Sequence, residues 1–248
     1  MKPLLIALPG NEVMAERIAE EIGGEIGTLE TRSFPDGESY LRYLTAVRSR
    51  KIALICSLEH PNEKFLPLAF AASTARELGA ARIGLVAPYL AYMRQDRRFH
   101  PGEALTSDIF ARSISTLFDW LVTVDPHLHR RSSLSEIYDI PARVVQAAPL
   151  FASWISENVD RPLLIGPDAE SEQWVSAIAQ ACGAPHVILK KERKGDRDVE
   201  ISIPNIADLE QTTPVLVDDI ISSGHTMIKT IAQLKMAGAR ETICMVVH

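Results

Sequence analysis

Short apolar runs rich in Ile, Leu and Val recur along the whole chain, separated by longer stretches of mixed polarity. Such runs, without polar alternation, are typical of strands that are buried on both faces of a parallel sheet. The runs that we interpret as strands cover residues 4–8, 52–56, 83–87, 121–124, 163–165, 187–189, 215–217 and 243–247.

The stretches between these runs carry apolar residues at helical spacing, which predicts amphipathic helices. The predicted helices cover residues 11–22, 65–78, 106–117, 171–181 and 226–237. The first begins at an Asn cap and the last is closed by Gly238. Because strands and helices alternate, we expect an α/β fold with parallel sheets flanked by helices on both faces and ligands at the carboxyl ends of the strands.

The chain has 248 residues, which is long enough for two domains of roughly 100–150 residues. Pro141 and Pro149 bracket a stretch that lacks a strong helical period. We therefore place a boundary there and expect domains at residues 1–145 and 146–248. The two halves have the pattern of similar α/β units.

The composition is that of an ordinary globular protein, with 46% apolar and 23% charged residues. A net charge of -6 argues against broad nucleic-acid binding. The apolar runs are too short for membrane helices, and no secretory signal precedes them. The chain has an odd number of cysteines, Cys56, Cys182 and Cys244, and their spacing fits neither a zinc site nor a redox motif. They indicate buried thiols in a reducing compartment. We expect a cytoplasmic protein without nucleic-acid or membrane partners.

An apolar strand, two adjacent carboxylates and a hydroxyl-rich turn precede the last predicted helix. Such a turn offers backbone N–H groups and hydroxyls to a phosphate, helped by the helix dipole, and the carboxylates can bind sugar hydroxyls. The alternative is an ordinary turn in which Ser222 or Ser223 caps the helix. We favour a ribose 5-phosphate site made of Asp218, Asp219, Ser222, Ser223, Gly224, His225 and Thr226.

Three other places carry candidate chemistry. Residues 94–98 form a compact charged loop whose guanidinium groups could converge on a polyphosphate, although a solvated turn fits the charges equally well. Asp168 follows a predicted strand and is a candidate magnesium ligand, because this ion prefers oxygen. His127 and His129 also follow a strand, where a histidine is more often a structural hydrogen-bonding residue.

Residues 214–226 resemble the PRPP-binding motif shared by type I phosphoribosyltransferases and PRPP synthetases, with Ser222 where many members have Asp and His225 where most have Gly. Three further segments resemble the PRPP synthetase (ribose-phosphate pyrophosphokinase) family in particular. Residues 31–38 are similar to its Arg-x-Phe-x-Asp-Gly-Glu segment, residues 88–99 to its Pro-Tyr-x-x-Tyr-x-Arg-Gln-Asp-Arg loop, and residues 123–127 to its magnesium-binding stretch. Residues 167–170 resemble its Pro-Asp-Ala-Gly motif, with Glu170 in place of Gly.

The resemblance covers most of the chain and implies two tandem phosphoribosyltransferase-like domains. The first would hold the ATP-binding elements and the second the ribose 5-phosphate loop. The second is expected to be shorter than usual, because family members continue for several dozen residues beyond the strand that ends at His248. The implied reaction transfers the pyrophosphoryl group of ATP to the C1 hydroxyl of ribose 5-phosphate, giving PRPP and AMP.

The resemblance also implies the roles of individual residues. Magnesium would be bound by His127 and Asp168, and Lys191 with Arg193 would form the Lys-x-Arg pair of a mobile catalytic loop. In family members the segment that residues 31–38 resemble reaches into the ATP site of a neighbouring subunit, so we expect a homo-oligomer with its ATP site at a subunit interface. The ATP-binding residues would be Phe34, Asp36, Glu38, Arg94, Gln95, Asp96 and Arg97.

Two alternatives stay open. A phosphoribosyltransferase that consumes PRPP would share the phosphate loop but would not need the segments around Phe34 and Arg94. A non-catalytic regulatory protein associated with a PRPP synthetase would share the fold. The presence of Lys191 and Arg193 argues against this second alternative, whereas His225 and Glu170 depart from the family pattern.

Overall fold

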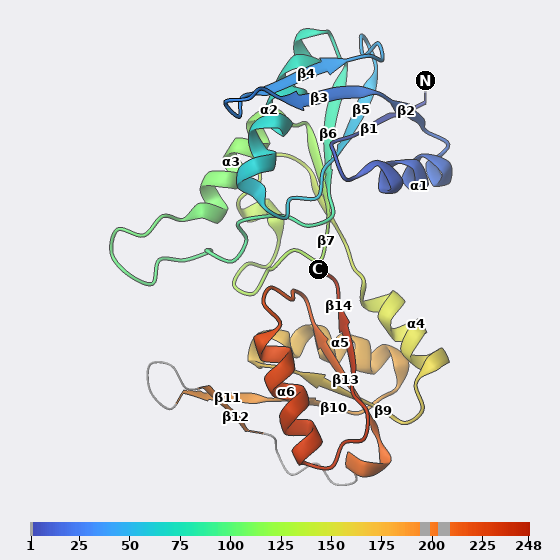
Figure 1. Cartoon of the computed structure of the whole chain (residues 1–248), viewed down its shortest axis with the longest axis vertical. Coiled ribbons are helices and arrows are strands. Elements are labelled where there is room, and N and C mark those ends of the chain that lie inside the picture. The colour runs from blue at the N-terminus through green and yellow to red at the C-terminus, as the bar shows by residue number, and fades with distance from the viewer. Residues whose placement is uncertain (1, 194–198, 203–208) are drawn as a thin grey trace. The chain divides into compact units, whose positions relative to one another are not determined.

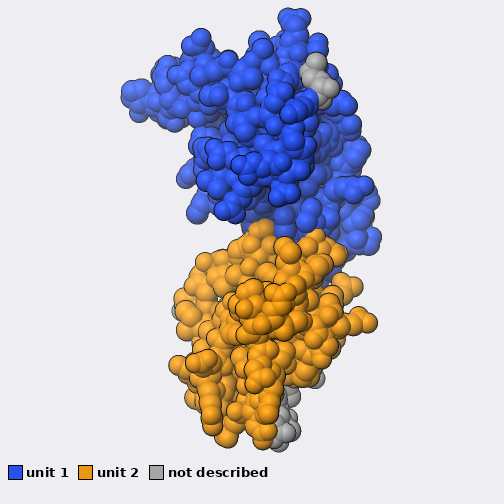
Figure 2. Space-filling view, turned by 90° about the vertical axis from the view of Figure 1, so that its right-hand side faces the viewer, with its two compact units in different colours: residues 1–145 blue, residues 146–248 orange. Residues whose placement is uncertain are grey.

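The computed structural model describes residues 2–193, 199–202 and 209–248 (Figure 1). The chain divides into two compact units, Met1–Val145 and Gln146–His248, each coloured separately in Figure 2. Each unit contains a parallel sheet with helices on both faces. The α/β class and the alternation of strands and helices are therefore confirmed.

The sheet of the first unit has the strand order β2-β1-β5-β6-β7-β8, and all its neighbouring strands are parallel. Its central strands are almost entirely apolar, as expected for strands covered on both faces. The strands are β1 (Leu4–Ala7), β2 (Glu25–Gly27), β5 (Lys51–Ile55), β6 (Arg82–Ala87), β7 (Trp120–Val124) and β8 (Ala142–Val145).

Three helices cover this sheet. α1 (Glu12–Ile22) packs on one face through Ala15 and Ala19. α2 (Pro61–Glu77) and α3 (Thr106–Leu117) cover the other face, where their apolar residues join the main core (Figure 1). A short 3-10 turn, η1 (Leu134–Glu136), packs against that core through Leu134.

An antiparallel hairpin extends from the first unit and was not predicted. Its strands are β3 (Leu29–Ser33) and β4 (Ser39–Tyr43). The Tyr43 hydroxyl donates a hydrogen bond of 2.7 Å to the carbonyl of Ala71, which fixes the base of the hairpin to α2. Residues 34–38 form its turn, with Gly37 at a φ of 93°.

The sheet of the second unit has the order β10-β9-β13-β14 and is also parallel. Its strands are β9 (Pro162–Gly166), β10 (His186–Ile188), β13 (Thr213–Asp218) and β14 (Ile243–Val246). A separate antiparallel ribbon pairs β11 (Lys190–Arg193) with β12 (Val199–Ser202).

Helices cover both faces of this second sheet as well. α6 (His225–Met236) packs on one face, and α4 (Ala148–Asn158) and α5 (Glu172–Cys182) pack on the other. Two 3-10 turns, η2 (Ala169–Ser171) and η3 (Leu209–Gln211), complete the elements of the described residues.

Several predicted boundaries differ from the structure. The second helix begins at Pro61 rather than at residue 65, with Pro61 in its first turn, where a missing N–H costs nothing. The stretch between Pro141 and Pro149 contains β8 and the start of α4, neither of which was predicted. No helix of the described residues is long and apolar enough to span a bilayer.

Asn11 occupies the N-cap position of α1, but its side chain makes no capping hydrogen bond. Its amide instead donates to the carbonyls of Leu8 and Pro9 at 3.2 Å, and its Oδ1 accepts from the backbone N–H of Ser57 at 2.8 Å. The side chain is buried, with 6% of the residue exposed. The predicted position of the cap is therefore correct, but the Asn11 side chain joins the loop after β1 to the loop after β5 instead of capping the helix.

Candidate functional site

Three carboxylates gather at one edge of the second sheet. Asp218 ends β13, Asp219 follows it, and Asp168 lies just after β9. Since β9 and β13 are paired and parallel, their carboxyl ends meet at the same edge. Burial, and then the negative charges of Asp219 and Asp168, raise the pKa of Asp218 to about 7. A cation bound at this edge would offset both causes.

The predicted phosphate turn follows Asp218 and Asp219 in the chain. Its backbone is tied to the end of the chain, because the His248 N–H donates to the Asp219 carbonyl at 3.0 Å and the Ile221 N–H donates to the His248 carbonyl at 2.9 Å. Gly224 takes the N-cap position of α6 with a φ of 73°. A Cβ there would have room, its nearest neighbour being Ile228 at 3.9 Å, so the backbone conformation rather than space favours glycine.

The side chains of this turn do not cap the helix. No side-chain capping bond is present at the start of α6, which excludes the ordinary Ser222 or Ser223 cap. Ser222 and Ser223 are exposed, as is His225 in the first turn of α6, and Thr226 is half-buried. The exposed hydroxyls and the N–H groups of the first turn can therefore serve a bound anion.

Lys191 and Arg193 lie in β11 rather than in an irregular loop. Lys191 is opposite Ile201 of β12, and Arg193 is opposite Val199. Because alternate strand positions share a face, positions 191 and 193 fall on one face of the ribbon and position 190 on the other. Residues 194–198 of the predicted catalytic loop lie outside the described residues.

Phe34, Asp36 and Glu38 lie in the exposed turn of the β3–β4 hairpin. The Phe34 N–H donates to the Glu38 carbonyl at 2.7 Å, and the Glu38 N–H donates to Asp36 Oδ1 at 3.2 Å. The guanidinium of Arg32 stacks on the rings of Phe34 at 4.5 Å and Tyr40 at 4.2 Å. The turn is therefore ordered by contacts within the hairpin, and it presents Phe34 with 39% of its surface exposed.

The charged loop after β6 contains two kinds of residue. Arg94 and Arg97 are exposed. Asp96 instead accepts two hydrogen bonds from Arg130, at 2.9 and 3.2 Å, and only 3% of its side chain is exposed. Gln95 accepts a hydrogen bond of 3.1 Å from the Thr106 hydroxyl. Within the first unit, Gln95 and Asp96 thus hold the loop in place while the two arginines face outward.

Arg130 was missed by the sequence interpretation, although it holds the charged loop. Its signal is the adjacent pair of cations, Arg130 and Arg131, shortly after a buried strand. Arg131 pairs with Asp108 of α3 at 2.5 Å. Both arginines follow His127, so one short segment supplies a predicted metal ligand and two loop-fixing cations.

His127 lies in the first unit, and Asp168 lies in the second. Nδ1 of His127 is 2.9 Å from Nε2 of His129, and the two rings meet edge to face with centroids 3.7 Å apart. This hydrogen bond fixes the ring of His127, so any metal-ligand role would fall to its Nε2 atom. The structure thus brings Asp168 together with Asp218 and Asp219 in the second unit. His127 contacts His129 within the first unit.

Two family models match the chain. Residues 4–117 match the N-terminal domain of ribose phosphate pyrophosphokinase, and residues 133–248 match the phosphoribosyl transferase domain. A ribose-phosphate pyrophosphokinase of Methanopyrus kandleri is 34% identical over 95% of this chain and 80% of its own length. One of Methanosarcina mazei is 34% identical over 98% of this chain and 80% of its own length.

A solved structure agrees with these matches at the level of the fold. The crystal structure of phosphoribosylpyrophosphate synthetase from Mycobacterium smegmatis superposes with a TM-score of 0.86. It covers 100% of this chain and 82% of its own, at 22% sequence identity. The comparison therefore extends the shared architecture to both units.

Proposed function

This chain belongs to the ribose-phosphate pyrophosphokinase family, and from that premise we propose how its residues carry out the family's reaction. The reaction moves the pyrophosphoryl group of ATP to the C1 hydroxyl of ribose 5-phosphate and gives PRPP and AMP. The observation that supports the proposal best is the edge of the second sheet, where Asp168 lies near Asp218 and Asp219 and the last two precede a hydroxyl-rich turn and a helix N-terminus.

Ribose 5-phosphate binds at this edge in our proposal. The turn formed by Ser222, Ser223, Gly224, His225 and Thr226 receives the phosphate, because its N–H groups point out of the first turn of α6. Asp218 and Asp219 accept hydrogen bonds from the sugar hydroxyls. The C1 hydroxyl is then held over the carboxylates, and the attack on the β-phosphorus of ATP needs no covalent enzyme intermediate.

Magnesium is the proposed cofactor. The gathered carboxylates suit it, because Mg²⁺ prefers oxygen ligands and because a cation would relieve the raised pKa of Asp218. We assign Asp168 as a ligand on this ground and His127 on the family resemblance. When bound, the ion neutralises charge on the polyphosphate oxygens.

ATP is proposed to bind to residues of the first unit. Arg94 and Arg97 bind the polyphosphate, while Gln95 and Asp96 keep their loop in shape through Thr106 and Arg130. Phe34, Asp36 and Glu38 are exposed on the hairpin turn, where they can complete the site of a neighbouring copy. We therefore propose a homo-oligomer with shared ATP sites.

Lys191 and Arg193 are the proposed catalytic residues, placed on one face of the β11–β12 ribbon. Their charges would stabilise the transferring group as negative charge develops on its oxygens. The proposed compartment is the cytoplasm, in keeping with the three free cysteines, Cys56, Cys182 and Cys244.

An AMP-release assay with ATP, ribose 5-phosphate and Mg²⁺ tests this function. We expect AMP to form only when all three are present. AMP release that does not depend on ribose 5-phosphate would contradict the proposal. Formation of pyrophosphate from PRPP and a nucleobase would instead indicate a phosphoribosyltransferase.

A further inference from the structure

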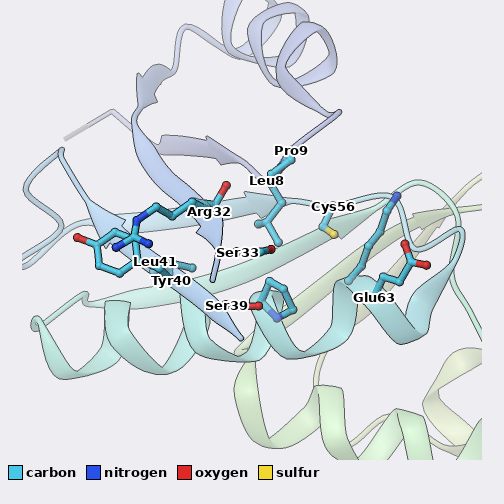
Figure 3. A pocket seen from close by; sticks show the side chains of 12 residues that line it. Leu8, Pro9, Arg32, Ser33, Ser39, Tyr40, Leu41, Cys56 and Glu63 are labelled. Carbon is cyan, nitrogen blue, oxygen red and sulfur yellow. The ribbon is translucent and has the colours of Figure 1, made fainter. Parts of the chain in front are cut away.

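A cavity of about 380 Å³ lies beneath the β3–β4 hairpin, within the first unit (Figure 3). Leu8 and Pro9, which follow β1, and Cys56, which follows β5, line it from the side of the sheet. The hairpin lines it from the opposite side, and α2 contributes Glu63 and Lys64. None of these residues belongs to the ATP or ribose 5-phosphate residues proposed above.

The position of this cavity in the sheet is one that binds ligands in open α/β folds. The chain passes from β1 to β2 on one side, whereas β5, β6, β7 and β8 follow on the other side of β1. The connecting helices change face at the same point, with α1 on one face and α2 on the other. The crevice outside the carboxyl ends of β1 and β5 is therefore a topological switch point, where such sheets bind their ligands.

The uncharged part of the lining suits a ring compound that carries hydroxyl groups. Leu8, Pro9 and Pro67 offer apolar surface for a planar ring. Burial raises the pKa of the Cys56 thiol to about 12, so that it stays neutral. Thr31 and Ser33 of β3 present hydroxyls from the hairpin, and no hydrogen bond of either hydroxyl is found within the described residues.

The cationic groups of the lining are already engaged. The Lys64 ammonium donates to the Ser57 carbonyl at 2.9 Å and forms an ion pair with Glu59. The Arg32 guanidinium stacks between Phe34 and Tyr40. The Glu63 carboxylate, in contrast, has no side-chain partner in the described part of the unit. The lining thus offers a carboxylate and hydroxyls to a ligand, and its cationic groups are not available to bind a phosphate.

We propose that this cavity is a second small-molecule site that binds an unphosphorylated nucleoside. The planar base lies on the apolar surface around Leu8, Pro9 and Pro67, and the pentose hydroxyls donate to the Glu63 carboxylate. A carboxylate that accepts from ribose hydroxyls at a switch point is a recurring arrangement in α/β folds. The cavity volume is within the range of small-molecule sites, roughly 300–1,000 Å³.

Titration calorimetry on the full chain tests the site, with adenosine and uridine as probes and saturating ATP and Mg²⁺ to fill the ATP site. We expect at least one probe to bind. Glu63→Gln should weaken it roughly tenfold, as expected for loss of a hydrogen bond to a charged group. Ser33→Phe should abolish binding by filling the cavity. Glu77→Gln, an exposed acid on the same helix, is the matched control and should bind as the unmodified chain does.

Two further measurements separate this site from the catalytic one. Glu63→Gln should leave AMP release unchanged, whether or not the proposed catalytic residues are correct. AMP should bind the cavity no more tightly than adenosine. Absence of binding by both nucleosides, equal affinity in Glu63→Gln and the unmodified chain, or AMP binding ten times tighter than adenosine would each overturn the proposal.

Discussion

In the first unit, the acids around the proposed ATP loop have basic partners, whereas in the second unit the acids gather with one another. Asp96 pairs with Arg130 and Asp108 pairs with Arg131. Asp218, by contrast, has a pKa raised to about 7 by burial and by the charges of Asp219 and Asp168. Paired charges hold a loop in one conformation, while gathered like charges favour the binding of a cation. Mutations in the charged loop of the first unit should therefore affect stability, whereas mutations at the carboxylate edge of the second should affect cation binding.

The largest effect is expected from the catalytic pair of the second unit. Lys191→Ala should lower kcat by about 10²–10³ and nearly preserve KM for both substrates, because its contact is made mainly in the transition state. Steady-state kinetics of AMP release measures this. Lys190→Ala, on the opposite face of β11, is the control and should change kcat by only a few fold. Equal losses in both variants would show that the assignment of Lys191 and Arg193 is wrong.

A smaller effect is expected at the gathered carboxylates. Asp168→Asn should raise the Mg²⁺ concentration for half-maximal rate by roughly tenfold or more, since removing a ligand should cost at least as much as removing a residue that supports one. Mg²⁺ titrations of AMP release measure it. Asp160→Asn, an exposed acid of the same unit, should leave the titration unchanged. His127→Ala should shift it in the same direction as Asp168→Asn, and unchanged titrations in both would remove them from the metal site.

The paired acids of the first unit should affect stability instead. Asp96→Ala removes the carboxylate that accepts two hydrogen bonds from Arg130 and should lower the free energy of unfolding by about 1–2 kcal/mol, because Arg130 is partly exposed. Urea denaturation measures this. Glu25→Gln, which breaks an exposed pair with Arg50, should cost less than about 1 kcal/mol. If Asp96→Ala shifted the Mg²⁺ titration without any loss of stability, Asp96 would act in cation binding, and the proposed difference between the acids of the two units would be wrong.

The mildest expected effect is a change in pH dependence. The folded pKa of Asp218, about 7, lies above its ordinary value of 3.8, so the folded state binds more protons than the unfolded state between these values. Without Mg²⁺, this carboxyl therefore lowers stability as pH rises through that window. Asp218→Asn should gain melting temperature relative to the unmodified chain at pH 8 but not at pH 4. A constant difference across this range would contradict the cause assigned to the shift.

Most of the fold could be predicted from the sequence, because buried parallel strands such as β1, β5 and β13 consist of continuous apolar runs. The strands β3 and β4 could not, since they are largely polar and their order depends on each other and on α2. β8 could not be predicted either, because it lies at the edge of the sheet and its order depends on pairing with one neighbouring strand, β7.

The candidate site was predictable only in part. Asp218 and Asp219 were found because they are adjacent to a strand and a turn. Asp168 lies near them because β9 pairs with β13. This proximity follows from the rule that the carboxyl ends of neighbouring parallel strands meet at one edge of the sheet. The partnership of Asp96 with Arg130 joins residues 34 positions apart, and no local pattern indicates it.

We propose that the carboxylate edge of the second unit binds ribose 5-phosphate for pyrophosphoryl transfer. The most direct test follows ATP, ribose 5-phosphate and Mg²⁺ by phosphorus NMR in the presence of this protein. We predict that AMP appears together with a diphosphate ester on C1 of the sugar, in equal amounts. Formation of ADP and a singly phosphorylated C1 would instead mean that only the γ-phosphoryl group is transferred, and would exclude pyrophosphoryl transfer.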